Sequence, residues 1–418
     1  MPVRPALSLI SASLKLWANS ERVAACIVGL LLLNYFCWIV LPGTALPVLA
    51  TALAIVLSVG YLCWEVSHGR LFVTLMVVGG FFLLFFAPPV DWDARSIWFY
   101  HARRMFFDGA LTKRLDGYAG NHPGYPDLLP AVFASIARIG GVWNEFLPKL
   151  GLLLGMLPPF IVLIARCKTT GTRLLMLGAL LFVADRQLLN GYMDAPLALY
   201  VVAAIVLLRE AASRTSSDKL WAPIIAMLSA SACIKDEGAV MAAILGVPLA
   251  VIVLRHSPST SRLVQFFLIV AVAAFPLIVW KQHAYAAGLR SEFLLAPLYL
   301  ARLRLASHES AVIVQAMWKY VSMPIGVFLL LAIIRRRIDP TVTWFVASYA
   351  CVLFTVYLVT PNDLRWHLAT SVDRVTLVFS LLAVAITVME LEAMADERWA
   401  PDNEKPPQYK ALKGAFIR

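Results

Sequence analysis

Two aspartates and an arginine lie close together in the segment Asp91-Trp92-Asp93-Ala94-Arg95. A neighbouring arginine keeps a carboxylate ionised, and an ionised carboxylate can take a proton from a hydroxyl group as a general base. Asp93 and Asp91 are therefore candidate catalytic residues. The alternative for either aspartate is a capping role at the start of a following helix.

A second charged group, Lys235-Asp236-Glu237-Gly238, interrupts two apolar runs without a connecting loop. Ionisable side chains in such a place are costly unless they are paired or face water, so these charges must face one another or a polar cavity. Lys235 is a candidate ligand for a phosphate oxygen, and Glu237 for a sugar hydroxyl or a partner cation.

Two further residues stand where an apolar helix is expected to begin. Asp194 follows a polar tip, and capping is again its alternative role. Arg374 can engage a phosphate through paired guanidinium donors. The alternative for Arg374 is a salt bridge to its neighbour Asp373 or to Asp363.

The elements that position these residues are membrane helices. The chain is 61% hydrophobic and 15% charged, whereas soluble domains have about 45–50% apolar and about 25% charged residues. Apolar runs long enough to span a hydrocarbon core of roughly 30 Å recur along the whole chain, which excludes a cleaved signal peptide as their explanation. We predict an all-α polytopic protein with about twelve transmembrane helices, at 23–41, 45–66, 71–90, 146–165, 174–184, 195–208, 220–234, 239–254, 263–280, 311–334, 341–359 and 375–389.

The distribution of basic residues predicts the orientation. The net charge of +11 comes from short Lys and Arg clusters between the apolar runs, such as 335–337. This pattern marks the cytoplasmic side and indicates no nucleic-acid partner. Both termini fall on that side if the helix count is even. The candidate site residues all fall on the opposite face.

This reading divides the chain into a transmembrane domain over 1–391 and a cytoplasmic polar tail over 392–418. Outer loops are expected over 91–145 and 281–310. Prolines in 123–130 exclude a continuous helix there, and the apolar stretch Leu128–Ile139 suggests a short interfacial helix.

Taken together, four motifs resemble those of the GT-C superfamily of bacterial membrane glycosyltransferases, which includes aminoarabinose transferases and protein mannosyltransferases. The resemblance covers about residues 91–374 and rests on motif order, spacing and a shared face. The motifs are Trp92-Asp93-Ala94-Arg95, His122-Pro123-Gly124-Tyr125-Pro126, Lys235-Asp236-Glu237-Gly238 and Trp366-His367-Leu368-Ala369-Thr370-Ser371-Val372-Asp373-Arg374.

The resemblance implies a GT-C-like fold and sugar transfer from a polyprenyl-phosphate donor to a glycan, lipid or protein acceptor, outside the cytoplasmic face of a bacterial inner membrane. In that superfamily an acidic residue of the first outer loop activates the acceptor, a role that falls on Asp93 or Asp91. Basic residues hold the donor phosphate, here Arg374, Lys235 and Arg365. The substrate-binding candidates are Arg95, His122, Tyr125, Asp194, Glu237 and His367.

This sequence departs from the superfamily's usual layout in two ways. Two apolar segments precede the helix that leads into the acidic loop, and the carboxylate box is not the Asp-Glu form of mannosyltransferases. The choice between Asp93 and Asp91 therefore stays open. Asp91, Asp93 and His122 are also suitable ligands for a divalent metal ion, although their spacing does not require one.

Two other classes of protein fit the composition. A transporter or flippase of a lipid-linked sugar or an anionic solute would use the same charges as a substrate path. The two halves of the chain show no repeat, however, and the charges gather at one face. A non-catalytic envelope scaffold would leave the charged face without a purpose.

Overall fold

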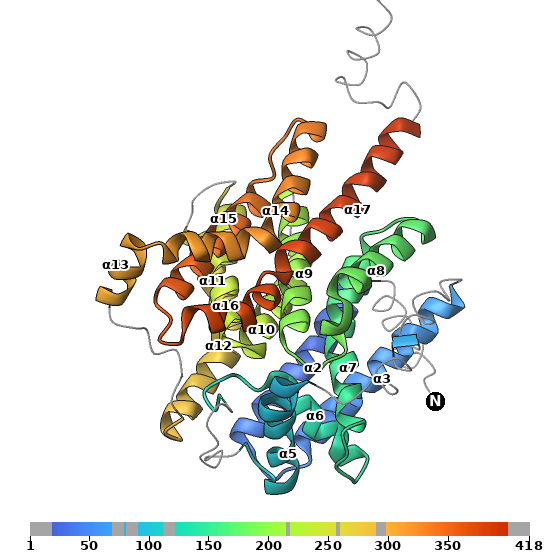
Figure 1. Cartoon of the computed structure of the whole chain (residues 1–418). Helices are drawn as coiled ribbons and strands as arrows, with labels where there is room; N and C mark the ends of the chain where they lie inside the picture. The colour runs from blue at the N-terminus through green and yellow to red at the C-terminus, as the bar shows by residue number, and fades with distance from the viewer. Residues whose placement is uncertain are drawn as a thin grey trace, which may run out of the picture.

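The computed structural model describes residues 19–68, 79–80, 91–111, 122–214, 218–255, 260–289 and 298–399. This part of the chain consists of helices and connecting turns, without a β-strand (Figure 1). Nine of its helices are long and apolar enough to cross a membrane, and three shorter ones are also apolar. The protein is therefore an all-helical polytopic membrane protein.

The helices follow one another along the chain in this order: α2 (Ser20–Val40), α3 (Leu46–Ser67), the π-helix η1 (Ala94–Trp98), α5 (Phe99–Asp108), α6 (Leu128–Ile139), α7 (Leu147–Ala165), α8 (Thr170–Ala184), the 3-10 helix η2 (Asp185–Leu188), α9 (Asp194–Ser213), the 3-10 helix η3 (Asp218–Leu220), α10 (Trp221–Ile234), α11 (Asp236–Leu254), α12 (Thr260–Ala286), α13 (Leu298–Ala306), α14 (Glu309–Arg335), α15 (Pro340–Leu358), α16 (Leu364–Val375) and α17 (Leu377–Trp399).

Every apolar segment predicted from the sequence except 71–90 coincides with one of these helices. The segment 71–90 lies largely outside the described residues. The expected boundary between membrane domain and polar tail, at residue 391, falls inside α17, because that helix continues to Trp399. Of the second outer loop, the described residues include the end of α12 and the short helix α13.

Side-chain caps define where several helices begin. Asp339 accepts a hydrogen bond from the Val342 backbone N–H at 3.0 Å, and Pro340 occupies the first helical position of α15. Asp363 accepts from the Trp366 backbone N–H at 2.8 Å and so begins α16. These bonds satisfy N–H groups that have no partner within the helix.

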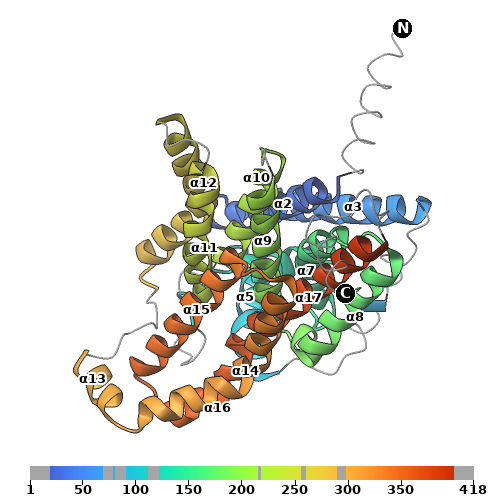
Figure 2. The same ribbon diagram turned by 90° about the horizontal axis from the view of Figure 1, so that it is seen from above.

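The protein core lies around α9, which packs against α7, α10, α11 and α17. The spanning part of α9 is 83% buried, whereas that of α12 is only 11% buried. Figure 2 shows α12 at the edge of the molecule, with α9 and α10 near its centre. The exposed apolar surface of α12 is suited to contact with lipid.

The short helix predicted over Leu128–Ile139 is present as α6, and it is enclosed by protein. Ten of its twelve residues are buried, and it packs among α2, α3, α5 and α7. Its Ser135 accepts a hydrogen bond from the Trp38 indole at 3.0 Å and donates one to Asn34 at 2.7 Å. The helix can be enclosed because most of its side chains are apolar and the buried polar Ser135 has hydrogen-bond partners inside the protein.

The basic residues from which the cytoplasmic side was predicted form ion pairs that connect the ends of several helices. Arg209 pairs with Asp339 and, at 2.8 Å, with Glu390. Arg335 also reaches Glu390, at 3.0 Å, and Glu397, at 2.8 Å. This network connects α9, α14, α15 and α17 at the ends opposite to the candidate site residues.

The break between α10 and α11 depends on Gly238. Lys235 has extended backbone angles (φ −159°, ψ 155°), and the two helices approach so closely there that a Cβ on Gly238 would lie 1.9 Å from the Ser231 carbonyl oxygen. Only glycine fits this approach without a shift of the backbone.

We expect Gly238→Ala to lower the free energy of unfolding by about 1–3 kcal/mol or more, because the clash is with a backbone atom. Gly246→Ala in the same helix is the matched control, since no atom lies within 4 Å of its Cβ position. The control should change stability by at most about 1 kcal/mol. Equal stability of the two variants in detergent unfolding curves would contradict the close approach.

Candidate functional site

Asp93 and Arg374 meet although 281 residues separate them in the chain. Asp93 directly precedes η1, and Arg374 lies near the end of α16, just before the break at Thr376. The guanidinium donates to Asp93 Oδ2 at 2.5 Å. The side chains are 30% and 17% exposed, so the pair is partly buried and weakly screened by solvent.

This pair takes the place of the two alternatives considered from the sequence, which were helix capping for Asp93 and a salt bridge to Asp373 or Asp363 for Arg374. The Asp93 side chain makes no capping hydrogen bond within the described residues. Asp363 caps α16 and does not pair with Arg374. The sequence suggested that Arg374 begins the last helix. Arg374 instead lies near the end of α16, and the last helix, α17, is separate and begins at Leu377.

A second, more deeply buried pair adjoins the first. Lys235 donates to Asp194 at 2.9 Å and lies 3.1 Å from Glu237. The other carboxylate oxygen of Asp194 is 4.0 Å from Arg374. Asp194 therefore joins the two cations and does not cap α9. The prediction that the charges of 235–237 face partners is confirmed, and Asp236 pairs with Lys281 at 2.7 Å.

We call Asp93, Arg374, Asp194, Lys235 and Glu237 the charge cluster. It holds three carboxylates and two cations and thus has one negative charge in excess. Burial by itself would lower the pKa of Lys235, but Asp194 and Glu237 outweigh burial and raise this pKa well above its ordinary value. Lys235 is therefore a permanent cation at neutral pH.

The charge cluster borders a cavity of about 10 Å³, enough for roughly one water molecule. Asp194, Glu237, Arg374 and Tyr349 line it together with apolar residues of α9, α11 and α17. Within the described residues, Arg374 Nε and Glu237 Oε2 are buried without a hydrogen-bond partner. One donor and one acceptor beside the same cavity suit a hydroxyl group, which can accept from one and donate to the other.

Aromatic rings flank this region from η1 and from the segment between α5 and α6. His122 stacks on Tyr125 with ring centroids 4.9 Å apart, and Tyr125 stacks on Trp98 at 5.6 Å. Burial raises the pKa of the Tyr125 phenol, and the Glu237 carboxylate raises it further. Tyr125 therefore remains a neutral hydrogen-bonding group beside the charge cluster. His122 has a positive φ of 47°, which is uncommon for a residue other than glycine.

The loop that carries these rings is firmly held. The His101 ring and the Asp127 carboxylate form a buried pair at 2.6 Å, and the Tyr35 hydroxyl accepts from the Asp127 backbone at 3.2 Å. From α12, the Trp280 indole donates to the Gly124 carbonyl at 3.3 Å. These contacts fix His122 and Tyr125 relative to α5 and α12.

Asp91 lies next to the charge cluster but bonds elsewhere. Its carboxylate accepts from the Asn190 side chain at 3.2 Å, and its backbone N–H donates to the Asn190 carbonyl at 3.1 Å. Asp91 thus anchors the turn before α9, whereas Asp93 contacts the phosphate-binding candidate Arg374. This difference favours Asp93 over Asp91 as the base.

Three predicted site residues lie apart from the charge cluster. Arg95 pairs with Glu145 at 2.8 Å, and both side chains are about half exposed. Arg365 is exposed at the other end of α16 from Arg374. His367 bonds through Nδ1 to the Thr360 hydroxyl at 2.8 Å. The first outer segment therefore supplies Asp93 to the cluster but not its adjacent arginine.

Two residues that sequence reasoning did not select contact predicted site residues. Tyr192 lies under Arg374, with 4.7 Å from the guanidinium carbon to the ring centroid. Asn190 bonds to Asp91. Their place in the polar segment before Asp194 was the only available signal, because their partners are distant in sequence.

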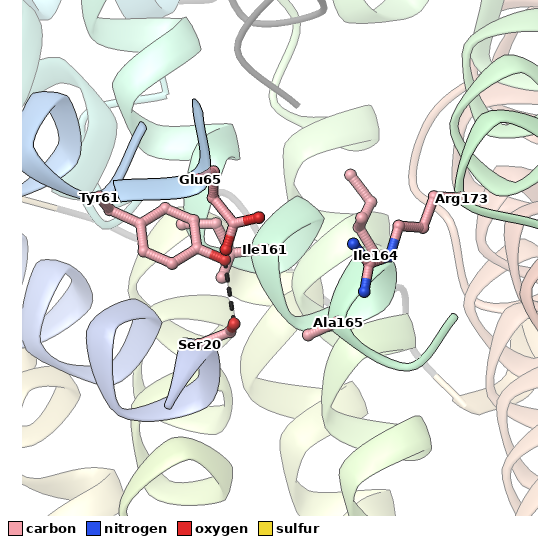
Figure 3. Close-up of a pocket in the computed structure, with 7 residues that line it drawn as sticks. All are labelled: Ser20, Tyr61, Glu65, Ile161, Ile164, Ala165 and Arg173. Atoms are coloured by element: carbon pink, nitrogen blue, oxygen red, sulfur yellow. Dashed lines mark hydrogen bonds between the residues drawn. The ribbon is translucent and has the colours of Figure 1, made fainter. Parts of the chain in front are cut away.

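Among the described residues, no group of three His, Cys, Asp or Glu side chains is placed to hold a metal ion. A second cavity of about 10 Å³ lies elsewhere, between α2, α3, α7 and α8. In Figure 3, Tyr61 donates to Ser20 at 2.9 Å, Glu65 lies beside the Tyr61 hydroxyl, and Arg173 faces them from α8. Glu65 is only 2% exposed within a membrane-length helix, which hydropathy alone did not reveal.

The fold and the charge cluster define a polytopic helical membrane protein with ionised groups buried at helix ends. No protein-family model matches the chain, and neither a curated protein nor a solved structure is significantly similar to it. The function must therefore be argued from the charge cluster.

Proposed function

We propose that this protein is a membrane glycosyltransferase that transfers a sugar from a polyprenyl-phosphate donor to an acceptor of the bacterial cell envelope. The observation that carries the proposal is the contact of Asp93 with Arg374. It places a carboxylate suited to proton transfer within 2.5 Å of a guanidinium suited to phosphate binding. A sugar phosphate that reacts with a hydroxyl group needs both functions at adjacent points.

In the proposed reaction the donor phosphate binds Arg374, with Lys235 as a second cation. Neutralising the phosphate makes it a better leaving group. The acceptor hydroxyl attacks the anomeric carbon, the bond from that carbon to the phosphate oxygen breaks, and Asp93 takes the hydroxyl proton. Direct displacement inverts the configuration at the anomeric carbon. The bond electrons leave with the polyprenyl phosphate.

The charge balance of the cluster supports a proton-accepting role for Asp93. The cluster has one carboxylate more than it has cations. The donor phosphate takes the place of Asp93 beside Arg374 and so frees the carboxylate, and the proton that Asp93 then takes from the acceptor removes this excess. Glu237 and the Arg374 Nε group offer an acceptor and a donor to a sugar hydroxyl beside the cavity.

The surroundings of the charge cluster agree with a lipid-linked donor. The cavity is bordered by α9, α11, α15, α16 and α17, and exposed apolar helices such as α12 and α14 offer surface to an isoprenoid chain. Basic residues near helix ends are expected on the cytoplasmic side, which supports placing the reaction at the outer face of the inner membrane. A divalent metal ion is a candidate cofactor.

The proposal is tested by incubating the purified protein in detergent with radiolabelled polyprenyl-phosphate sugars and a membrane acceptor extract. We expect one donor to be consumed and its sugar to appear in product. Arg374→Gln should reduce turnover of that donor at least tenfold by removing the phosphate contact. Arg103→Gln, in the exposed part of α5, is the control and should retain full turnover.

A transporter is the competing function, and the same preparation decides between the two. If no donor is consumed but liposomes containing the protein move a labelled polyprenyl-phosphate lipid between leaflets, the protein is a transporter of lipid-linked substrates. Reconstituted protein that shows neither activity would contradict both functions.

A further inference from the structure

Tyr192 lies beside the Asp93–Arg374 pair. The guanidinium of Arg374 lies over its ring, with 4.7 Å to the centroid. Burial and the adjacent Asp93 carboxylate raise the pKa of this phenol. The hydroxyl is therefore neutral at physiological pH and keeps its proton.

The position of Tyr192 is itself fixed by the turn that precedes α9. Its backbone N–H donates to the Asn190 side chain at 3.0 Å. Asn190 in turn exchanges two hydrogen bonds with Asp91, at 3.1 and 3.2 Å. The turn 190–192 is thus tied to the segment that carries Asp93, and only the Tyr192 ring extends from it to α16.

An ion pair between two flexible side chains from distant segments does not by itself set their positions. Long side chains lose rotational freedom when they are held in one geometry. A rigid aromatic ring under the guanidinium restricts Arg374 by a cation–π contact, at little entropic cost to the ring. That contact persists when the Asp93 carboxylate is replaced by another anion.

We propose that Tyr192 is a positioning residue whose ring holds Arg374 in the orientation that binds an anionic lipid phosphate. This role rests on the part of the proposed function in which the charge cluster binds a lipid phosphate, and it does not require that a sugar is transferred.

Two variants test the action of the ring, with undecaprenyl phosphate as the binding probe. Tyr192→Phe keeps the ring, so we expect unchanged affinity for undecaprenyl phosphate. Tyr192→Leu removes the ring, so we expect this affinity to fall about three- to thirtyfold. Thermal unfolding of both variants controls for folding.

The outcomes distinguish this role from a structural one. Equal affinity of wild type and Tyr192→Leu would overturn the action of the ring. Equal loss of affinity in the Phe and Leu variants would also overturn it, because the ring would then make no separate contribution. If no donor is turned over and yet Phe restores the affinity that Leu loses, the ring's role stands while glycosyl transfer fails.

Discussion

Replacing Asp93 by asparagine should reduce turnover of the donor by about 10²- to 10⁴-fold, the range expected for loss of a general base. The same substitution should tighten binding of undecaprenyl phosphate. Arg374 donates to Asp93 at 2.5 Å in the resting protein, so the carboxylate competes with any phosphate for the guanidinium. An amide carries no charge and competes less. Initial rates and equilibrium binding of the lipid phosphate, measured on one preparation, check both effects.

Asp108→Asn is the matched control for this experiment. Asp108 pairs with Arg104 at 3.2 Å in α5, with both side chains about one-third exposed. The substitution thus neutralises an aspartate in another Asp–Arg pair of the same outer segment, and both turnover and binding should stay near wild type. If Asp93→Asn keeps near-normal turnover in a correctly folded protein, Asp93 is not the base.

Replacing Lys235 by methionine should produce the largest loss of stability, about 3–5 kcal/mol, because it leaves buried carboxylates without their cation. Asp194 and Glu237 both lie within 3.1 Å of the ammonium, and the Asp194 side chain is only 7% exposed. Adding Asp194→Asn to Lys235→Met should recover part of the loss. The free energy of unfolding in mixed detergent and denaturant measures both effects.

Lys281→Met provides the comparison for a pair of the same type at a more exposed place. Lys281 is 42% exposed and pairs with Asp236 at 2.7 Å. Exposed pairs contribute about 0–1 kcal/mol, so this variant should unfold close to the wild type. If Lys235→Met were no less stable than Lys281→Met, the buried pair would not be the stabilising feature proposed.

Local sequence features predicted the helices well because apolar run length is a property of contiguous residues. The charges of 235–237 were also predictable as a mutually paired group, since two apolar runs leave no loop to solvate them. The helices were found from the average hydropathy of long apolar runs, and the same averaging concealed Glu65. One carboxylate in α3 hardly changes the hydropathy of a 22-residue helix.

The partners within the candidate site were harder to predict because they come from distant segments. The sequence suggested Arg95 as the neighbour of the Asp93 carboxylate. Arg95, in η1, instead pairs with Glu145, and Arg374 of α16 pairs with Asp93. Tyr192 and Asn190 carry no motif of their own. Their roles depend on how the turn before α9 packs against η1 and α16, which is a tertiary property.

The placement of α12 has a consequence for how the protein responds to its lipid surroundings. At about 1.5 Å per residue its 27 residues extend roughly 40 Å, more than the roughly 30 Å of a hydrocarbon core. A helix longer than the bilayer adjusts by tilting. Trp280 and Lys281 near its end contact Gly124 in the loop that carries His122 and Tyr125. We therefore expect a change in bilayer thickness to act, through these contacts, on the loop beside the charge cluster.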